Sequence, residues 1–117
     1  MSYYRSAKPK YGNRKTEVDG FYFDSAKEAR RYGELKILQK AGQISDLQMQ
    51  VPFEVIPGVV NEETGRVMQK PATYVADFTY RKDGKFVVED AKGYRTEGYK
   101  LKKKLMLWRH GIQVKEV

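Results

Sequence analysis

Apolar and polar positions alternate in two runs between residues 74 and 93, a pattern typical of half-buried β-strands. Asp83-Gly84 lies between the runs, and this dipeptide favours the two-residue turn of a β-hairpin. Because the turn fixes the pairing register, we expect Asp77 to lie directly opposite Asp90. The pattern therefore predicts a strand pair that places two carboxylates side by side.

A second Asp-Gly pair, at 19–20, predicts a small hairpin over residues 17–24. Ser25 follows, with Glu28 three residues later, and this spacing is the capping box of a helix start. The helix is expected to cover Ala26–Lys40 and to end at Ala41-Gly42.

The remaining elements follow the same rules. They are a strand at 51–56, a polar connection at 61–66, a helix that begins at Thr96 and Glu97 and ends at His110 before Gly111, and a final strand at 112–117. Pro52 indicates a strand start, a bulge or a sheet edge. Together they predict an α/β fold with a single mixed β-sheet flanked by helices, in the order helix, strand, strand, strand, helix, strand. The last strand–helix–strand unit should place its two strands parallel.

Side chains alternate between the two faces of a strand, which divides the hairpin residues into two sets. One face carries the charged residues Asp77, Asp90 and Lys92 with Val75, Thr79 and Val88. The other face carries Tyr74, Ala76, Phe78, Tyr80, Val87, Glu89 and Ala91. The first face is therefore predicted to gather two acids and a lysine.

Two like charges directly opposite one another destabilise a sheet. A hard divalent cation removes this repulsion, since Mg²⁺ binds oxygen ligands and commonly takes one or two carboxylates from a protein. Asp77 and Asp90 fit that description, and the backbone carbonyl of Ala91 is expected at the same place. Lys92 would then orient a water molecule or stabilise charge developing on a phosphate. The alternative is a solvated face on which Lys92 only neutralises the acids.

The first helix offers a fourth group. Glu28, Tyr32 and Leu35 recur at helical spacing, so Glu28 should point towards the sheet if the other two pack on it. It would bind the metal directly or through water. The alternative is that Glu28 only completes the capping box with Ser25.

The formal net charge of +8 over 117 residues favours a polyanionic partner, nucleic acid first and an anionic membrane surface second. Residues 1–16 are basic and lack apolar periodicity, so they are expected to form a mobile arm before a single domain at 17–117. In the second helix, Lys100, Lys103 and Lys104 are candidate phosphate contacts, with Arg95 just before it. A merely solvated face is the alternative. Leu101, Leu105 and Trp108 are predicted to form the apolar stripe of this helix.

Several classes are excluded or disfavoured. The chain has no cysteine, which excludes disulfides and cysteine-based zinc sites. It shows no run long enough to span a membrane, no secretory signal and no phosphate-binding glycine loop. We therefore expect a cytoplasmic protein that does not bind nucleotides through such a loop.

Glu28 in a first helix, Asp77 ending a strand and Asp90-Ala91-Lys92 in the next strand resemble the motif of the PD-(D/E)XK nuclease superfamily. The segments FDSAKEARRYGELKILQKAGQISDLQ, YVADF and VVEDAKG are similar to small phage-borne endonucleases related to Holliday-junction resolvases and to the endonuclease subunit of some transposition systems. For a phage-encoded protein, the location would be the bacterial host cytoplasm. Ala76 stands where the superfamily motif has proline. Glu89 is one residue out of phase with Lys92, so Asp90 is the better second acid.

The resemblance implies Mg²⁺- or Mn²⁺-dependent hydrolysis of phosphodiester bonds in DNA, including branched or junction DNA. It implies Asp77 and Asp90 as metal ligands, Lys92 as the catalytic lysine and Glu28 as the helix acid. A non-catalytic DNA-binding module of the same fold is the main alternative, and an assembly protein with a coincidental charge pattern is another. Cleavage of both strands would need two centres, so a homodimer is a further expectation.

Overall fold

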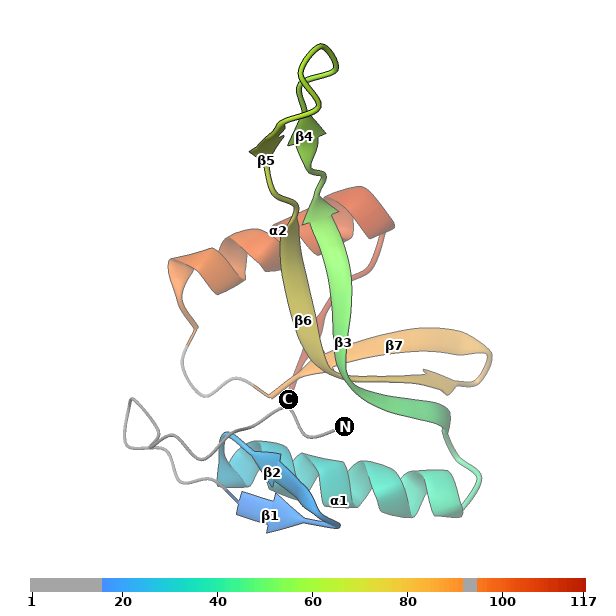
Figure 1. Cartoon of the computed structure of the whole chain (residues 1–117). Coiled ribbons are helices and arrows are strands. Elements are labelled where there is room, and N and C mark those ends of the chain that lie inside the picture. The colour runs from blue at the N-terminus through green and yellow to red at the C-terminus, as the bar shows by residue number, and fades with distance from the viewer. Residues whose placement is uncertain (1–15, 92–94) are drawn as a thin grey trace.

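A computed structural model describes residues 16–91 and 95–117, and the predicted basic arm lies almost wholly outside them. The described elements follow one another as ten short helices and strands (Figure 1). Their bounds are β1 Thr16–Val18, β2 Phe21–Phe23, α1 Ala26–Lys40, β3 Ser45–Ile56, β4 Val59–Val60, β5 Val67–Gln69, β6 Ala72–Lys82, β7 Lys85–Asp90, α2 Glu97–His110 and β8 Lys115–Glu116.

The central sheet has four strands in the order β3, β6, β7 and β8. β6 pairs antiparallel with both β3 and β7, whereas β8 pairs parallel with β7. α2 connects these two parallel strands, so the predicted α/β class, mixed sheet and crossover are confirmed. Pro52 lies within β3, an edge strand of the sheet that begins at Ser45 and not at the predicted residue 51.

Local signals predicted the turns and helix ends correctly. Asp83 and Gly84 have φ angles of 52° and 76°, as the hairpin turn requires. The side chain of Ser25 accepts a hydrogen bond from the Glu28 backbone at the start of α1. Thr96 caps α2 in the same way, and Gly111 ends that helix with a φ of 68°.

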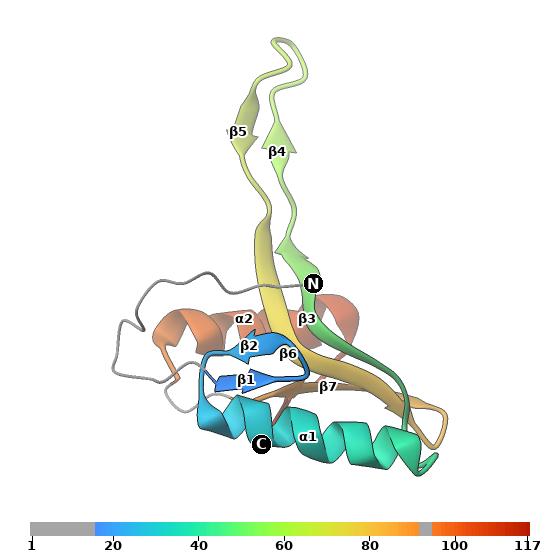
Figure 2. The same ribbon diagram turned by 60° about the horizontal axis from the view of Figure 1, so that its bottom comes forward.

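The segment predicted as a polar connection is part of a further hairpin. β4 and β5 pair antiparallel, and residues 61–66 form the tip between them. The β4–β5 hairpin continues the β3–β6 ribbon away from the body of the protein (Figure 2). Exposed apolar side chains lie along it, namely Val59, Val60, Val67 and Met68. Its strands were missed because two and three residues are too few for a periodicity signal.

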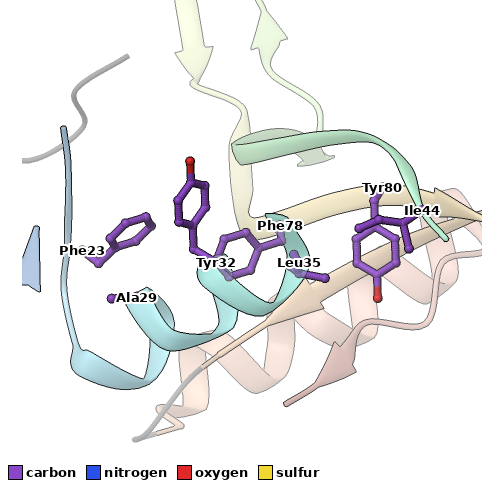
Figure 3. Close-up of a cluster of buried hydrophobic side chains, with 7 residues drawn as sticks. All are labelled: Phe23, Ala29, Tyr32, Leu35, Ile44, Phe78 and Tyr80. Carbon is purple, nitrogen blue, oxygen red and sulfur yellow. The ribbon is translucent and has the colours of Figure 1, made fainter. Parts of the chain in front are cut away.

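Two apolar clusters hold the helices to the sheet. The first joins Tyr32 and Leu35 of α1 to Phe78 and Tyr80 of β6, as predicted for the α1 residues (Figure 3). The second contains Tyr99 and Met106 of α2. Its other buried members are Val55, Tyr74, Ala76, Val88 and Val114.

The predicted two-face division of the hairpin is wrong within β6. Tyr74 and Ala76 belong to the α2 cluster, but Phe78 and Tyr80 belong to the α1 cluster. β3 and β6 both bend sharply along their length (Figure 1). Gln50 of β3 is a non-glycine residue with a φ of 53°, and its neighbours Met49 and Val51 pair with Phe78 and Ala76. Alternation along a regular strand therefore does not extend across this point.

The predicted apolar stripe of α2 holds for Leu105, which packs against the second cluster, but is wrong for Leu101 and Trp108. Trp108 is 78% exposed and Leu101 is 55% exposed, whereas Tyr99 and Met106 are buried. α2 carries apolar residues around most of its circumference, so its sequence fits more than one buried face. Neither described helix is long and apolar enough to cross a lipid bilayer.

Candidate active site

Three predicted acids come from three different elements and are all buried. Glu28 lies in the first turn of α1, Asp77 near the middle of β6 and Asp90 at the end of β7. Their exposed fractions are 4%, 6% and 0%. Buried carboxylates are rare because each must be hydrogen-bonded or paired with a positive charge. Their surroundings therefore indicate whether they serve structure or chemistry.

Gln50 connects the first two acids. Its side-chain nitrogen Nε2 lies 3.1 Å from Oε2 of Glu28 and 3.3 Å from Oδ1 of Asp77. The Glu28 side chain therefore points towards the sheet, as predicted. A residue with positive φ in the middle of a strand is strained, and such strain often accompanies function. The sequence gives no signal for this backbone conformation, so Gln50 was missed.

Asp77 is also tied to the end of β7. Its Oδ2 accepts a hydrogen bond of 2.8 Å from the backbone N–H of Ala91. The β6–β7 ladder has the predicted register. It ends at the pair Phe78 and Glu89, so Asp77 and Asp90 lie one position beyond its last pair. In β7, Asp90 instead pairs with Glu116 of β8. The hairpin thus brings Asp77 to the segment that contains Asp90 and Ala91.

Asp90 faces the second cluster. Its Oδ2 accepts a hydrogen bond of 2.6 Å from the hydroxyl of Tyr74. Burial raises the pKa of Tyr74 well above its ordinary value, and the hydrogen bond to Asp90 raises it further. Tyr74 therefore stays protonated and donates to Asp90 at any physiological pH.

Glu89 has a different environment from Asp90. The guanidinium of Arg31 binds both its oxygens, at 2.8 Å and 2.6 Å, and the hydroxyl of Tyr80 donates to it as well. Burial alone would raise the pKa of Glu89, but the hydrogen bonds from Arg31 and Tyr80 and the charge of Arg31 hold it below its ordinary value. Glu89 is thus engaged on the α1 side, which favours Asp90 as the second acid of the site.

The predicted basic residues differ in their partners and exposure. Lys92 lies outside the described residues. Lys100 pairs with Glu97 within α2 at 3.8 Å, and Lys104 is exposed on the same helix. Arg95 and Lys103 both contact Glu116, a residue that the sequence patterns did not single out. It was missed because it is close to them only in the folded chain.

The donor set fits a hard divalent cation, since carboxylate and carbonyl oxygens are its preferred ligands. Across 16–91 and 95–117, however, no three His, Cys, Asp or Glu side chains lie close enough together to hold a metal ion. The amide of Gln50 lies between Glu28 and Asp77, where a shared cation would lie. Ligation by both acids would therefore require this amide to move aside or to turn its oxygen to the ion.

Two surface hollows lie elsewhere. The larger, about 400 Å³, is lined by Asp19, Lys36, Ile37, Gln39 and Lys40. The smaller, about 190 Å³, is lined by Lys27, Arg30, Arg31, Glu34 and Val117. Neither includes Glu28, Asp77 or Asp90. We take the acids as the candidate site because three buried carboxylates are less common than a shallow hollow on a helix.

A family model described as a protein of unknown function, DUF1064, matches residues 8–116. The chain belongs to the DUF1064 family. No curated protein matches its sequence, and no solved structure does. The site residues Glu28, Gln50, Asp77, Asp90 and Glu116 all lie within the part matched by the DUF1064 model.

Proposed function

We propose that this DUF1064 protein is a divalent-metal-dependent endonuclease that hydrolyses phosphodiester bonds in DNA. The observation that carries the proposal is the linkage of the three acids. Gln50 bridges Glu28 and Asp77, and Asp77 in turn binds the backbone beside Asp90. Acids from α1, β6 and β7 thereby share one buried region, in keeping with the motif that the sequence resembles.

In this proposal Asp77, Asp90 and the carbonyl oxygen of Ala91 hold Mg²⁺ or Mn²⁺, with Glu28 bound directly or through water. A metal held there would supply Lewis-acid chemistry to the scissile phosphate and would make a bound water easier to deprotonate. Lys92 orients the attacking water or stabilises charge on the phosphate.

Basic side chains of α2 and the segment before it contact the flanking backbone. These are Arg95, Lys100, Lys103 and Lys104. Such contacts recognise DNA without reading its sequence, so the preferred substrate would be set by DNA shape. Branched or junction DNA, cut by a homodimer, is the finer form of the proposal.

The test is cleavage of labelled single-stranded, duplex, flap and four-way-junction DNA in Mg²⁺, Mn²⁺ or chelator. We expect metal-dependent cutting that Asp77→Asn and Lys92→Ala abolish. Glu28→Gln should reduce it, whereas Glu34→Gln, on the exposed side of the same helix, should leave it unchanged. Cutting that persists in Asp77→Asn would contradict the proposal.

A second candidate is a DNA-binding module without catalysis. It is favoured by the missing three-residue metal cluster within the described residues and by the two neutral donors that already satisfy Asp77. This candidate predicts that wild-type protein and Asp77→Asn bind DNA equally in chelator and that neither cuts any of the four substrates.

A further inference from the structure

Three donors converge on one oxygen of Glu116. The hydroxyl of Tyr99 and Nε of Arg95 each lie 2.9 Å from its Oε2, and Nζ of Lys103 lies 3.3 Å from the same atom. Tyr99 and Lys103 are one turn apart on α2, and Arg95 lies just before that helix. The cluster therefore consists of two cations and a hydroxyl that surround a single anionic oxygen.

This donor set is suited to a phosphate. Guanidinium, ammonium and hydroxyl groups are the side chains that most often contact the phosphates of nucleic acids. Burial raises the pKa of Tyr99, and its hydrogen bond to Glu116 raises it further, so its hydroxyl remains a donor. Glu116 supplies a carboxylate where a phosphate oxygen would otherwise lie.

The Glu116 carboxylate lies at an accessible position, where another anion can displace it. Its side chain is 27% exposed, and those of Arg95 and Lys103 are 36% and 34% exposed. Ion pairs at such accessible positions are weak because water and salt screen them. β8 comprises only Lys115 and Glu116, so few contacts oppose a movement of this side chain.

The cluster also adjoins the candidate active site. Glu116 pairs with Asp90 in the parallel β7–β8 ladder, and the Val117 N–H donates to the Asp90 carbonyl. A phosphate bound by Arg95, Lys103 and Tyr99 would therefore lie beside the acids. Neighbouring phosphates of one DNA strand are close enough for both positions to be filled by a single backbone.

We propose that Arg95, Lys103 and Tyr99 form a binding site for a DNA phosphate next to the scissile one, and that Glu116 occupies this site as an internal anion until DNA displaces it. The inference rests on the proposed action on DNA. It makes Glu116 an inhibitory residue for DNA binding. The competing role is a purely structural one, in which Glu116 fastens the last strand to α2.

The experiment measures the affinity of Glu116→Gln for a labelled duplex by fluorescence anisotropy, in chelator and at several salt concentrations. The matched control is Glu54→Gln, which removes the same charge and releases Arg109 of α2 from an ion pair. We expect Glu116→Gln to raise affinity about three- to tenfold more than the control and to steepen the salt dependence by about one phosphate contact. Adding Lys103→Gln should abolish this gain.

An affinity of Glu116→Gln equal to or below that of Glu54→Gln would overturn the proposal in favour of the structural role. Thermal unfolding shows whether the variant folds. If it does not, Lys103→Gln in the wild-type background decides, because it should weaken DNA binding more than Lys102→Gln on the same helix. An equal effect of the two lysine variants would contradict the proposal.

Cleavage of the same duplex by wild-type protein in Mg²⁺ tests the proposed function separately. Cleavage without a gain from Glu116→Gln would contradict only the phosphate site. Absence of DNA binding in every variant would contradict both proposals.

Discussion

Adjacent carboxylates of β7 lie in contrasting surroundings on the two sides of the sheet. On the α1 side, Glu89 is bound by both arms of the Arg31 guanidinium and by Tyr80. In the candidate site, Asp90 accepts from the hydroxyl of Tyr74. Asp77 accepts from the Ala91 N–H and from the Gln50 amide, which also donates to Glu28 of α1. A buried acid with an arginine partner has its charge balanced for structure. Asp77 is held by two neutral donors and keeps a negative field that a cation can use.

The largest effect should come from breaking the structural side. Arg31→Met leaves Glu89 fully buried without its guanidinium, and removal of one partner from a buried pair costs about 3 kcal/mol or more in the free energy of unfolding. Urea unfolding measures the loss. Arg30→Met, an exposed neighbour, should change stability little, and an equal loss in both variants would show that the pair is not structural.

The opposite response is expected on the candidate catalytic side. Asp77→Asn should lower metal-dependent cleavage by about 100-fold or more, since loss of a ligand should cost at least as much as loss of a residue that only orients one. Its free energy of unfolding should change by no more than about 1 kcal/mol, because the amide oxygen still accepts from Ala91. A stability loss as large as that of Arg31→Met would abolish the contrast between the two sides.

Gln50 allows a sharper test of positioning. Gln50→Asn keeps a side chain that tolerates positive φ but shortens the amide, so it can no longer bridge Glu28 and Asp77. We expect cleavage to fall about tenfold with the unfolding free energy nearly unchanged. Restored cleavage at higher Mn²⁺ concentration would mark a loss of metal affinity, whereas unchanged cleavage would exclude a positioning role.

The smallest effect concerns pH. The folded-state pKa of Glu89 lies below its ordinary value of 4.5, so its contribution to stability is complete above that pH and is lost as the pH falls through the folded-state pKa. The free energy of unfolding of the wild-type protein, measured with urea, should therefore fall as the pH drops below 4.5. The free energy of unfolding of Arg31→Met should fall less over this acid range, because without Arg31 the pKa of Glu89 is no longer held below its ordinary value. Parallel acid curves for the two proteins would contradict this assignment.

Features set by a few neighbouring residues could be predicted from the sequence. Asp83-Gly84, Ser25 and Gly111 each favour one backbone geometry, and the corresponding turn, helix start and helix end follow. The parallel β7–β8 pair also follows, from the short crossover through α2.

Features set by tertiary contacts could not be predicted. Tyr74 and Ala76 pack in the α2 cluster, although strand alternation groups them with Phe78 of the α1 cluster. The positive φ of Gln50 in the neighbouring strand is likewise a feature that strand alternation does not predict. Gln50 lies 27 residues from Asp77 in the chain, and no periodicity links such distant positions. Trp108 was misplaced because α2 offers more than one apolar face, and the choice depends on the sheet it meets.

Titration of the protein with Mn²⁺, followed by electron paramagnetic resonance, tests most directly whether the acids on the catalytic side hold a metal. The account predicts a bound Mn²⁺ signal in wild-type protein and in Glu34→Gln. It predicts that Asp77→Asn and Asp90→Asn, both shown to be folded by thermal unfolding, lose that signal. A wild-type protein that binds no Mn²⁺, or a signal that survives both aspartate substitutions, would contradict the account.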